Sequence, residues 1–600
     1  MPEPVASSRP GMGAVPFEGG VTFRVWAPHA EGVSVTGSFC DWDAAGTPLA
    51  REDGGSWSAD VAAARPGDEY RLLVRAGEER SRLDPRARQL TSSVGNAVVY
   101  DPAAFDWGTA EFNTPAWNDL VIYELHVGTF SAGMHGRPGT LEGVRRRLGY
   151  LRELGIGAIQ LMPPFEFAGD RSWGYNPAYP FAVESSYGRP DDLKALVRAA
   201  HETGIAVLVD VVYNHLGPSD LDIWRFDGWS QNEKGGIYFY QDDRSATPWG
   251  DTRPDYGRPE VRAFLRDNAM AWLEEFRIDG LRWDATAYIS SISGGGSGAP
   301  DRIADGWDLM AAINAEAAER FAGRLMIAED LRGDPAITRA AGEGGAGFGA
   351  QWDLGFVRRV RAALIAASDE ARDLDAVAAA LAIDPADAFK RVIYTESHDE
   401  DANGSSRLPE EIWPGYADSW PSRKRAALGA ALVLTAPGIP MLFQGQELIE
   451  GSWFSDDDPI DWSKRHRHSG LLQLHRDLIR LRRNGDDTTR GLRGPRLAVH
   501  HVDRATGILA YHRWADGGPR DDVVVVVSFS AEVRPDIRLG VPREGRWRVR
   551  FNSDWEGYDP EFASTPSLDA DAVSEPLDGM QFSIRVGVGP YASVILSQDE

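Results

Sequence analysis

The chain has 600 residues, more than one hydrophobic core usually supports, so we expect several domains. Its net charge is −27 and its basic residues are scattered, which argues against nucleic-acid binding because that function needs a basic face. No apolar run approaches the roughly 20 residues of a membrane span, so we expect no membrane insertion.

Cysteine content and the first residues bear on the compartment. The single cysteine, Cys40, excludes an intrachain disulfide, which agrees with a reducing environment. The first twenty residues show no basic segment followed by an apolar one, so we expect no signal peptide. Together these features predict a cytoplasmic protein.

The first hundred residues predict a small β-sandwich. Residues 21–28, 32–39 and 69–77 alternate apolar and polar side chains, with Gly, Pro and Asp between them. Residues 103–119 are polar and aromatic and predict a linker. We therefore expect an N-terminal domain over 1–105.

From about residue 120 the pattern changes to strands alternating with helices. We predict helices over 139–156, 191–205, 259–276, 311–322 and 422–436. We predict strands within 120–127, 158–164, 206–215, 280–285, 324–330, 347–353, 391–399 and 439–447. Eight short apolar strands alternating with helices are typical of a (β/α)₈ TIM barrel.

The barrel domain is expected to cover 106–490 and to contain one long insertion. Residues 216–258 are rich in Gly, Trp, Asp and Pro, and a stretch of that length without regular structure usually has a function. After the barrel, residues 491–600 return to alternating strands and predict a C-terminal antiparallel β domain. The predicted fold class is therefore α/β, a TIM barrel flanked by N-terminal and C-terminal β-sandwich domains.

Three carboxylates close predicted barrel strands: Asp284, Glu329 and Asp399. Such groups point into the mouth of a barrel, where catalysis takes place. Two carboxylates flanking a sugar bond are the minimal equipment for glycoside hydrolysis. Arg282 lies two residues before Asp284 and therefore shares its face, where a fixed cation keeps the carboxylate ionised.

Each of these residues, taken alone, could have a structural role instead of a catalytic one. A single Asp at a strand end often caps the following helix. Asp210 could simply pair with Arg282, and Trp283 must face away from Arg282 and pack between strand and helix. The joint occurrence of Asp284, Glu329 and Asp399 at strand ends favours a catalytic set.

Four short sequences together resemble a known family. DVVYNH (210–215), GLRWDA (280–285), IAED (327–330) and SHD (397–399) follow one another in the order of the conserved regions of the α-amylase superfamily, glycoside hydrolase family 13. Residues 21–42 resemble the family-48 carbohydrate-binding modules that precede such barrels. The C-terminal strands fit the β-domain that such enzymes usually carry.

The resemblance implies a role for each candidate residue. Asp284 would be the nucleophile that forms a glycosyl-enzyme, Glu329 the general acid and base, and Asp399 the residue that binds sugar hydroxyls and favours the distorted ring. Arg282 would orient Asp284. The sugar before the cut would bind to Tyr175, Asp210, His215 and His398, with the tyrosine stacked beneath it.

Cofactors and metals receive less support from the sequence. No Gly-rich phosphate loop and no His/Cys zinc cluster appears, so we expect no cofactor. Asn214 matches a position that binds calcium in many amylases, but it could equally be a buried, hydrogen-bonded amide. The metal content is therefore left open.

Specificity within the family is the finest question that the sequence raises. YFYQDDRSATPWGD (238–251) and GGAGFGAQWD (344–353) resemble maltooligosyltrehalose trehalohydrolases, whereas ESHDE (396–400) and MLFQGQE (441–447) are similar to glycogen branching enzymes. Ala285 to Ala287 follow Asp284 where many amylases carry a Lys–His pair, which argues against a plain amylase.

We therefore expect a retaining enzyme that cleaves α-1,4-glucosidic bonds in an α-glucan or maltooligosaccharide and transfers the chain to a 6-hydroxyl. The alternatives are a trehalohydrolase that releases trehalose, an amylase-type hydrolase and an inactive glucan-binding protein. Glu400 stands where trehalohydrolases have Gln, so we expect the loop after Asp399, with Glu400, to select the acceptor. The oligomeric state is left open.

The N-terminal domain could itself bind glucan. Trp26, Trp42 and Trp57 lie on its short predicted strands, and flat sugar faces stack well on aromatic rings. The alternative is that these tryptophans belong to the core of the domain.

Overall fold

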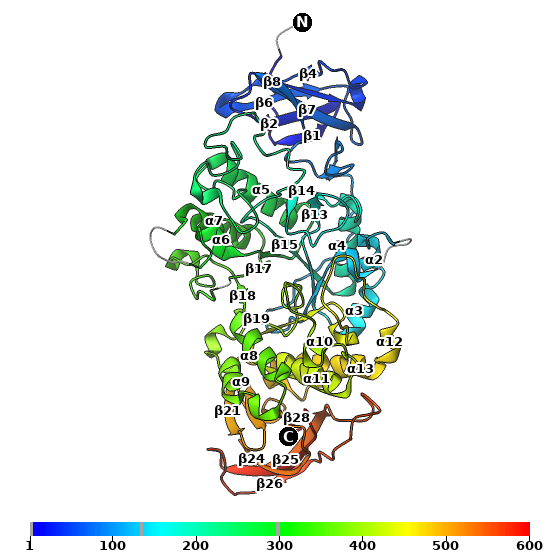
Figure 1. The fold of residues 1–600 in the computed structure, drawn as a ribbon, viewed down its shortest axis with the longest axis vertical. Helices are drawn as coiled ribbons and strands as arrows, with labels where there is room; N and C mark the ends of the chain where they lie inside the picture. The colour runs from blue at the N-terminus through cyan, green and yellow to red at the C-terminus, as the bar shows by residue number, and fades with distance from the viewer. Residues whose placement is uncertain (1–3, 132–135, 296–300, 331, 600) are drawn as a thin grey trace. The chain divides into compact units, whose positions relative to one another are not determined.

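The computed structural model describes residues 4–131, 136–295, 301–330 and 332–599 (Figure 1). The chain divides into two units. The first comprises residues 1–113, 126–146 and 161–348, and the second comprises 114–125, 147–160 and 349–600.

Eight parallel strands form one closed barrel, in chain order around the sheet. They are β11 (Ile122–Leu125), β12 (Ala158–Leu161), β15 (Ala206–Val211), β16 (Gly280–Trp283), β17 (Leu325–Ala328), β18 (Ala350–Trp352), β19 (Arg391–Ile393) and β20 (Ile439–Phe443). Each lies within a predicted strand, and the predicted TIM barrel is confirmed.

Strand register in the first unit determines which polar side chains meet. Arg282 on β16 pairs in register with Asp210 on β15 and with Ile327 on β17. The next residue, Trp283, points the other way, is fully buried and packs edge-on against Tyr213 with ring centroids 4.8 Å apart. Side chains alternate along a strand, so Arg282 faces the opposite side from this apolar packing.

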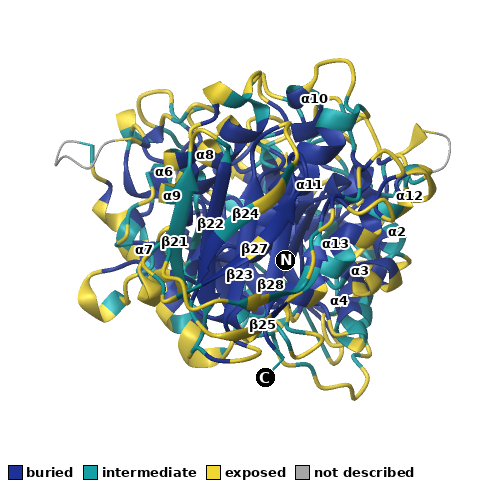
Figure 2. Cartoon of the chain, turned by 90° about the horizontal axis from the view of Figure 1, so that it is seen from below, coloured by how far each residue is buried: buried dark blue, intermediate teal, exposed yellow. Residues whose placement is uncertain are grey.

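Helices follow most of the barrel strands. They are α1 (Val127–Phe130), α2 (Leu141–Arg145), α3 (Leu148–Leu154), α4 (Pro190–Thr203), α5 (Pro259–Glu274), α6 (Thr286–Ser290), α7 (Ala304–Arg320), α8 (Leu354–Ile365), α9 (Leu374–Leu381), α10 (Leu408–Ile412), α11 (Trp420–Thr435), α12 (Lys464–Arg467) and α13 (Ser469–Arg482). A proline opens α4 and α5, where its missing N–H costs nothing, and Gly204 ends α4 in the left-handed conformation. Helix α11 is buried along most of its length (Figure 2).

The prediction of one continuous helix is wrong for one segment. Residues 139–156 were expected to form one helix, but the structure has two, α2 and α3. The interruption lies at Arg147, whose backbone is not helical (φ −103°, ψ 4°). Its guanidinium lies over the ring of Trp462 at 3.6 Å, a cation–π contact that helical periodicity cannot reveal.

The N-terminal segment forms two antiparallel sheets, one in the order β1-β2-β6-β5 and one in the order β4-β3-β7-β10-β9, with β8 paired to β7. The strands are β1 (Gly13–Phe17), β2 (Gly20–Trp26), β3 (Gly32–Gly37), β4 (Thr47–Pro48), β5 (Ala50–Arg51), β6 (Ser56–Val61), β7 (Glu69–Ala76), β8 (Glu78–Arg82), β9 (Gln89–Leu90) and β10 (Ala97–Val98). Strands β2, β3 and β7 coincide with the three predicted strands.

The three tryptophans of this segment separate into two groups. Trp26 and Trp57 are buried, with 7% and 8% of their surfaces exposed, and the indole of Trp57 donates a hydrogen bond to the carbonyl of Ala27 at 3.0 Å. Trp42 is 41% exposed. The core interpretation is therefore right for Trp26 and Trp57, and only Trp42 retains a surface that could stack on sugar.

A hairpin in the first unit was not predicted. It consists of β13 (Phe165–Phe167) and β14 (Pro177–Val183), and all residues of both strands are buried. Pro177 and Pro180 obscure the strand pattern, since proline cannot donate a ladder hydrogen bond and normally argues against a strand. The irregular register between the two strands accommodates these prolines.

The insertion over 216–258 packs on the N-terminal sheets within the same unit. Its one helical element is a short 3₁₀ turn, Asp243–Ser245. Asp222 forms an ion pair with Arg71 at 2.9 Å, and Asp227 accepts a hydrogen bond from the backbone N–H of His29 at 2.9 Å. The insertion is therefore anchored although it has little regular structure.

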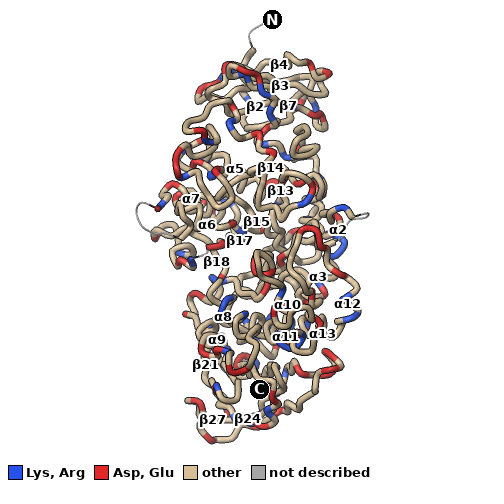
Figure 3. Tube along the Cα trace, viewed as in Figure 1, with Lys and Arg blue, Asp and Glu red and all other residues tan. Residues whose placement is uncertain are grey.

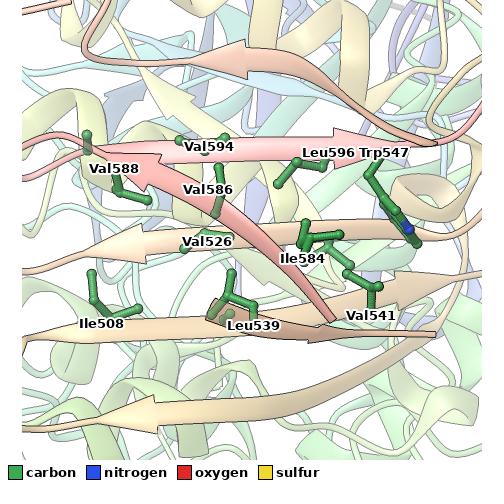
Figure 4. Close-up of a cluster of buried hydrophobic side chains, with 13 residues drawn as sticks. Ile508, Val526, Leu539, Val541, Trp547, Ile584, Val586, Val588, Val594 and Leu596 are labelled. Carbon is green, nitrogen blue, oxygen red and sulfur yellow. The ribbon is translucent and has the colours of Figure 1, made fainter. Parts of the chain in front are cut away.

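The C-terminal segment forms a second antiparallel sandwich, with one sheet in the order β21-β22-β23-β28-β25-β26 and a pair β24-β27. The strands are β21 (Arg496–Asp503), β22 (Ile508–Trp514), β23 (Val523–Ser528), β24 (Arg534–Val541), β25 (Gly545–Asn552), β26 (Ala570–Ala572), β27 (Phe582–Val588) and β28 (Ser593–Ser597). Figure 4 shows the apolar side chains between these strands that form its core. Strand β24 was not predicted, because Pro535 and three charged residues interrupt its apolar alternation.

A buried ion pair within the second unit generates a stability prediction. Lys424 on α11 lies 2.6 Å from Asp554 in the C-terminal sandwich, and both side chains are buried. Lys424→Met should destabilise the protein by about 3–5 kcal/mol, because it leaves a buried carboxylate without its cation. Urea unfolding measures the change. Arg504→Met, which breaks an exposed ion pair with Asp375, is the control and should leave the midpoint unchanged; equal effects of both variants would contradict the prediction.

Candidate active site

A single buried guanidinium connects three carboxylates in the first unit. Arg282 Nη1 lies 2.8 Å from Asp210 Oδ2 and 3.3 Å from Asp284 Oδ1, and its Nη2 lies 2.9 Å from Glu329 Oε2. Arg282 lies near Asp284, as their two-residue spacing predicts. Its pairing with Asp210 agrees with the structural interpretation that the sequence offered for Asp210. The contact with Glu329 was not predicted, because it joins two strands whose register the sequence does not reveal.

Burial and charge act in opposite directions on Arg282. Its side chain is fully buried, which by itself disfavours the cation. The negative charges of Asp210 and Glu329 outweigh that effect and raise the pKa of Arg282 well above its usual value. The arginine is therefore a permanent cation.

Asp284 is held from a second side by an amide. Asn214 Nδ2 donates to Asp284 Oδ2 at 2.8 Å and to the backbone carbonyl of Asp284 at 3.0 Å. Asn214 is fully buried, as expected if it is a hydrogen-bonded amide. Among the described residues, no three His, Cys, Asp or Glu side chains gather as a metal site would require.

The backbone turn after β16 contacts Glu329. The N–H of Ala285 donates to Glu329 Oε2 at 2.9 Å, and the Thr286 side chain donates to the Glu329 backbone carbonyl at 2.9 Å. Ala285 has φ 39°, in the left-handed region that a residue with a Cβ seldom adopts. Strained backbone of this kind concentrates at functional sites, and here it directs an N–H toward a predicted catalytic carboxylate.

Tyr175 joins the same polar group. Its hydroxyl donates to Asp210 Oδ2 at 2.5 Å, and the Arg282 guanidinium lies 5.7 Å from the centre of its ring. Tyr175, Asp210, Arg282, Asp284 and Glu329 thus form one connected group within the first unit.

His215 links this group to the long insertion. Its Nδ1–H donates a hydrogen bond to the Asn214 side-chain oxygen, and its ring stacks on Trp249, with centroids 4.6 Å apart and planes inclined by 13°. Burial lowers the pKa of His215 to about 4, although the nearby Asp284 acts in the opposite direction. Trp249 was not among the predicted site residues; an aromatic residue in the long insertion was the only signal.

His398 and Asp399 belong to the second unit. His398 Nδ1 lies 2.8 Å from Oε1 of the buried Glu124 on β11, which orients the imidazole. Asp399 directly follows it and has 44% of its side-chain surface exposed. Glu124 was not predicted as a site residue, although a carboxylate inside an apolar strand could have drawn attention to it. That Asp399 acts together with Asp284 and Glu329 stays a prediction.

Glu400 turns toward a buried arginine. Its carboxylate lies 4.0 Å from Arg361, which also pairs with Asp401 at 3.2 Å and Glu411 at 3.0 Å. Burial raises the pKa of Glu400, although Arg361 acts in the opposite direction. These contacts give Glu400 a structural role, and its predicted role in acceptor selection stays a prediction.

Residues of both charges are distributed along the described chain. Lys and Arg residues are interspersed with Asp and Glu along the trace (Figure 3). In the part of the chain that the structure describes, no helix combines the length and apolarity that crossing a bilayer requires.

Comparison with protein families gives three matches along the chain. Residues 11–87 match the family described as carbohydrate-binding module 48, the isoamylase N-terminal domain. Residues 122–224 match the alpha amylase catalytic domain, and residues 499–599 match the alpha amylase C-terminal all-beta domain.

Similar proteins extend over nearly the whole chain. The 1,4-alpha-glucan branching enzyme of Kitasatospora aureofaciens is 33% identical over 98% of this chain and 78% of its own length. That of Salinibacter ruber is 30% identical over 98% of this chain and 96% of its own length. The solved structure of an Anoxybacillus pullulanase complexed with maltotetraose superposes with a TM-score of 0.75 at 22% identity, covering 98% of this chain and 88% of that one. This last likeness concerns the fold alone.

The burial of His215 generates a prediction about acid stability. The folded state keeps this imidazole neutral to about pH 4, whereas in the unfolded chain it takes up a proton near pH 6.5. Protons therefore favour the unfolded state between these values, and the free energy of unfolding should fall as the pH drops from 6.5 to 4. In His215→Gln, which cannot titrate, that fall should be smaller. Urea unfolding at a series of pH values measures both slopes; identical slopes would contradict the prediction.

Proposed function

The chain belongs to the α-amylase family, glycoside hydrolase family 13, and on this basis we propose that it is a 1,4-α-glucan branching enzyme. The observation that carries the proposal is its similarity, over nearly its full length, to branching enzymes from distant bacteria. We further propose the domain division 1–105, 106–490 and 491–600.

In the proposed first step, Asp284 attacks the anomeric carbon of an α-1,4-linked glucosyl unit. The bond from C1 to the 4-oxygen breaks, and Glu329, which takes up a proton from solvent before this step, gives that proton to the departing oxygen. A covalent glycosyl-enzyme forms between C1 and Asp284. The contacts of Asp284 with Arg282 and Asn214 support its role, because they hold the attacking carboxylate in a fixed orientation.

In the proposed second step, the 6-hydroxyl of another glucan chain attacks the same carbon. Glu329 now accepts the hydroxyl proton, the bond from C1 to Asp284 breaks, and an α-1,6 branch forms with the original configuration. Arg282 contacts both carboxylates, so one cation stabilises the negative charge as it passes from one to the other.

The remaining candidates would bind the sugar. Asp399, exposed in the segment that follows β19, would accept hydrogen bonds from hydroxyls, since the loops after the parallel strands of a barrel meet at one mouth. Asp210, His215 and His398 would bind the same glucosyl unit, and Tyr175 would stack beneath it. The low pKa of His215 supports a neutral hydrogen-bonding role.

Linkage analysis tests the proposed reaction. The protein is incubated with amylose and, separately, with maltooligosyltrehalose, and the products are read by proton NMR. We expect new α-1,6 signals from amylose. Asp284→Asn is the matched control and should lose these signals by at least about 10³-fold while still binding amylose. Free trehalose would instead identify a trehalohydrolase, shortened linear chains an amylase, and binding without reaction an inactive glucan-binding protein.

The role of Glu329 is tested with two leaving groups. Glu329→Gln should slow the reaction of amylose by about 10²–10⁴-fold, because the departing 4-oxygen needs a proton. The rate with α-glucosyl fluoride as glycosyl donor should fall far less, because fluoride leaves without a proton. The initial rates of both substrates are measured with wild type and variant. Equal losses on both would exclude Glu329 as the general acid.

A further inference from the structure

Three large aromatic side chains stand exposed on two connecting segments of the second unit. Trp413, Tyr416 and Trp453 have 48%, 65% and 62% of their surfaces exposed. The first two lie between β19 and α11, in the segment that also contains Asp399, and the third lies between β20 and α12. Trp and Tyr usually bury most of their surface, so a group this exposed calls for a function.

One carboxylate holds the two segments together. Glu410 accepts hydrogen bonds from the backbone N–H of Gly415 at 2.6 Å and, more weakly, of Ser452 at 3.5 Å. The carbonyl of Ser452 in turn accepts from the N–H of Arg407 at 2.9 Å. Trp413 and Tyr416 lie within two residues of Gly415, and Trp453 directly follows Ser452. The same hydrogen bonds therefore help to position all three aromatic residues.

One of the three rings, Tyr416, lines a cavity with a mixed lining. The rings of Trp413 and Tyr416 have centroids 6.0 Å apart and planes inclined by 65°, so they present two differently directed faces. The cavity has a volume of about 470 Å³, and Glu410, Asp418, Lys464 and Arg467 line it together with Tyr416. Flat apolar faces next to hydrogen-bonding groups of both charges suit a neutral ligand with flat faces and many hydroxyls.

We propose that Trp413, Tyr416 and Trp453, the aromatic platform, bind an α-glucan chain outside the group of catalytic carboxylates. This inference rests on the proposed function, which makes such a chain the substrate. It follows from continuity, because the segment with Asp399 runs directly into the platform. The exposed faces of the three rings supply the contact of this surface with glucan.

The platform predicts a dependence on chain length. A long chain has enough glucosyl units to contact the exposed rings of this segment as well as Asp399, whereas a short oligosaccharide covers fewer sites. Removing a ring should therefore weaken the binding of amylose more than the binding of maltotriose. Stacking on one ring corresponds to about a three- to tenfold change in dissociation constant.

Binding is measured by calorimetry in the full-length Asp284→Asn protein, so that the polymer is not consumed. We expect Trp413→Ala, Tyr416→Ala and Trp453→Ala each to raise the dissociation constant for amylose about three- to tenfold, and that for maltotriose less than about twofold. Trp453→Phe should recover most of the loss. Trp555→Ala is the matched control, because Trp555 is 51% exposed in the C-terminal sandwich of the same unit. It should leave both constants unchanged.

Unchanged amylose binding in the three platform variants, with native thermal unfolding, would overturn the platform. An equal loss in Trp555→Ala would also overturn it, because any exposed tryptophan would then suffice. The measurement does not depend on the linkage formed. Failure to detect α-1,6 bonds with wild type removes the branching proposal, whereas failure of the binding comparison removes only the platform.

Discussion

The candidate site depends on one buried cation. Arg282 is fully removed from water, and the carboxylates of Asp210, Asp284 and Glu329 offset the cost of burying its charge. The dependence is mutual, since each carboxylate is fixed in position by the same guanidinium. Removing one member would leave the others with uncompensated charge in a place that water does not reach. The chemistry and the stability of this part of the barrel therefore share one set of contacts.

Strand geometry explains how a few residues assemble the candidate site. Arg282 lies on β16 and Asp284 directly follows the strand, two residues further on, so both side chains lie on one face. Asp210 lies beside Arg282 through the register of β15 with β16. The left-handed turn at Ala285 then aims a backbone N–H at Glu329. Asn214 completes the arrangement at Asp284. Each contact arises where a strand ends, which is where a barrel presents side chains to a substrate.

Local patterns predicted the barrel strands, because burial on both faces leaves a continuous apolar run. Two of the predicted catalytic carboxylates, Asp284 and Glu329, directly follow such a run. The same reasoning missed elements whose local signal is contradictory. Prolines concealed β14, Pro535 and charges concealed β24, and a stacking contact on Trp462 divided the helix expected over 139–156. Contacts between distant segments, such as Glu124 with His398, leave no local pattern at all.

The insertion over 216–258 couples two parts of the first unit mechanically. At one end of it, Asp222 and Asp227 are bound to Arg71 and to the backbone of His29 in the N-terminal sheets. Near its other end, Trp249 stacks on His215. A truncation that removes the N-terminal sheets would thus release the support of a residue at the site as well as any carbohydrate-binding surface. Loss of activity in a truncated protein would therefore not reveal which of the two was needed, and only changes that leave the insertion anchored can separate them.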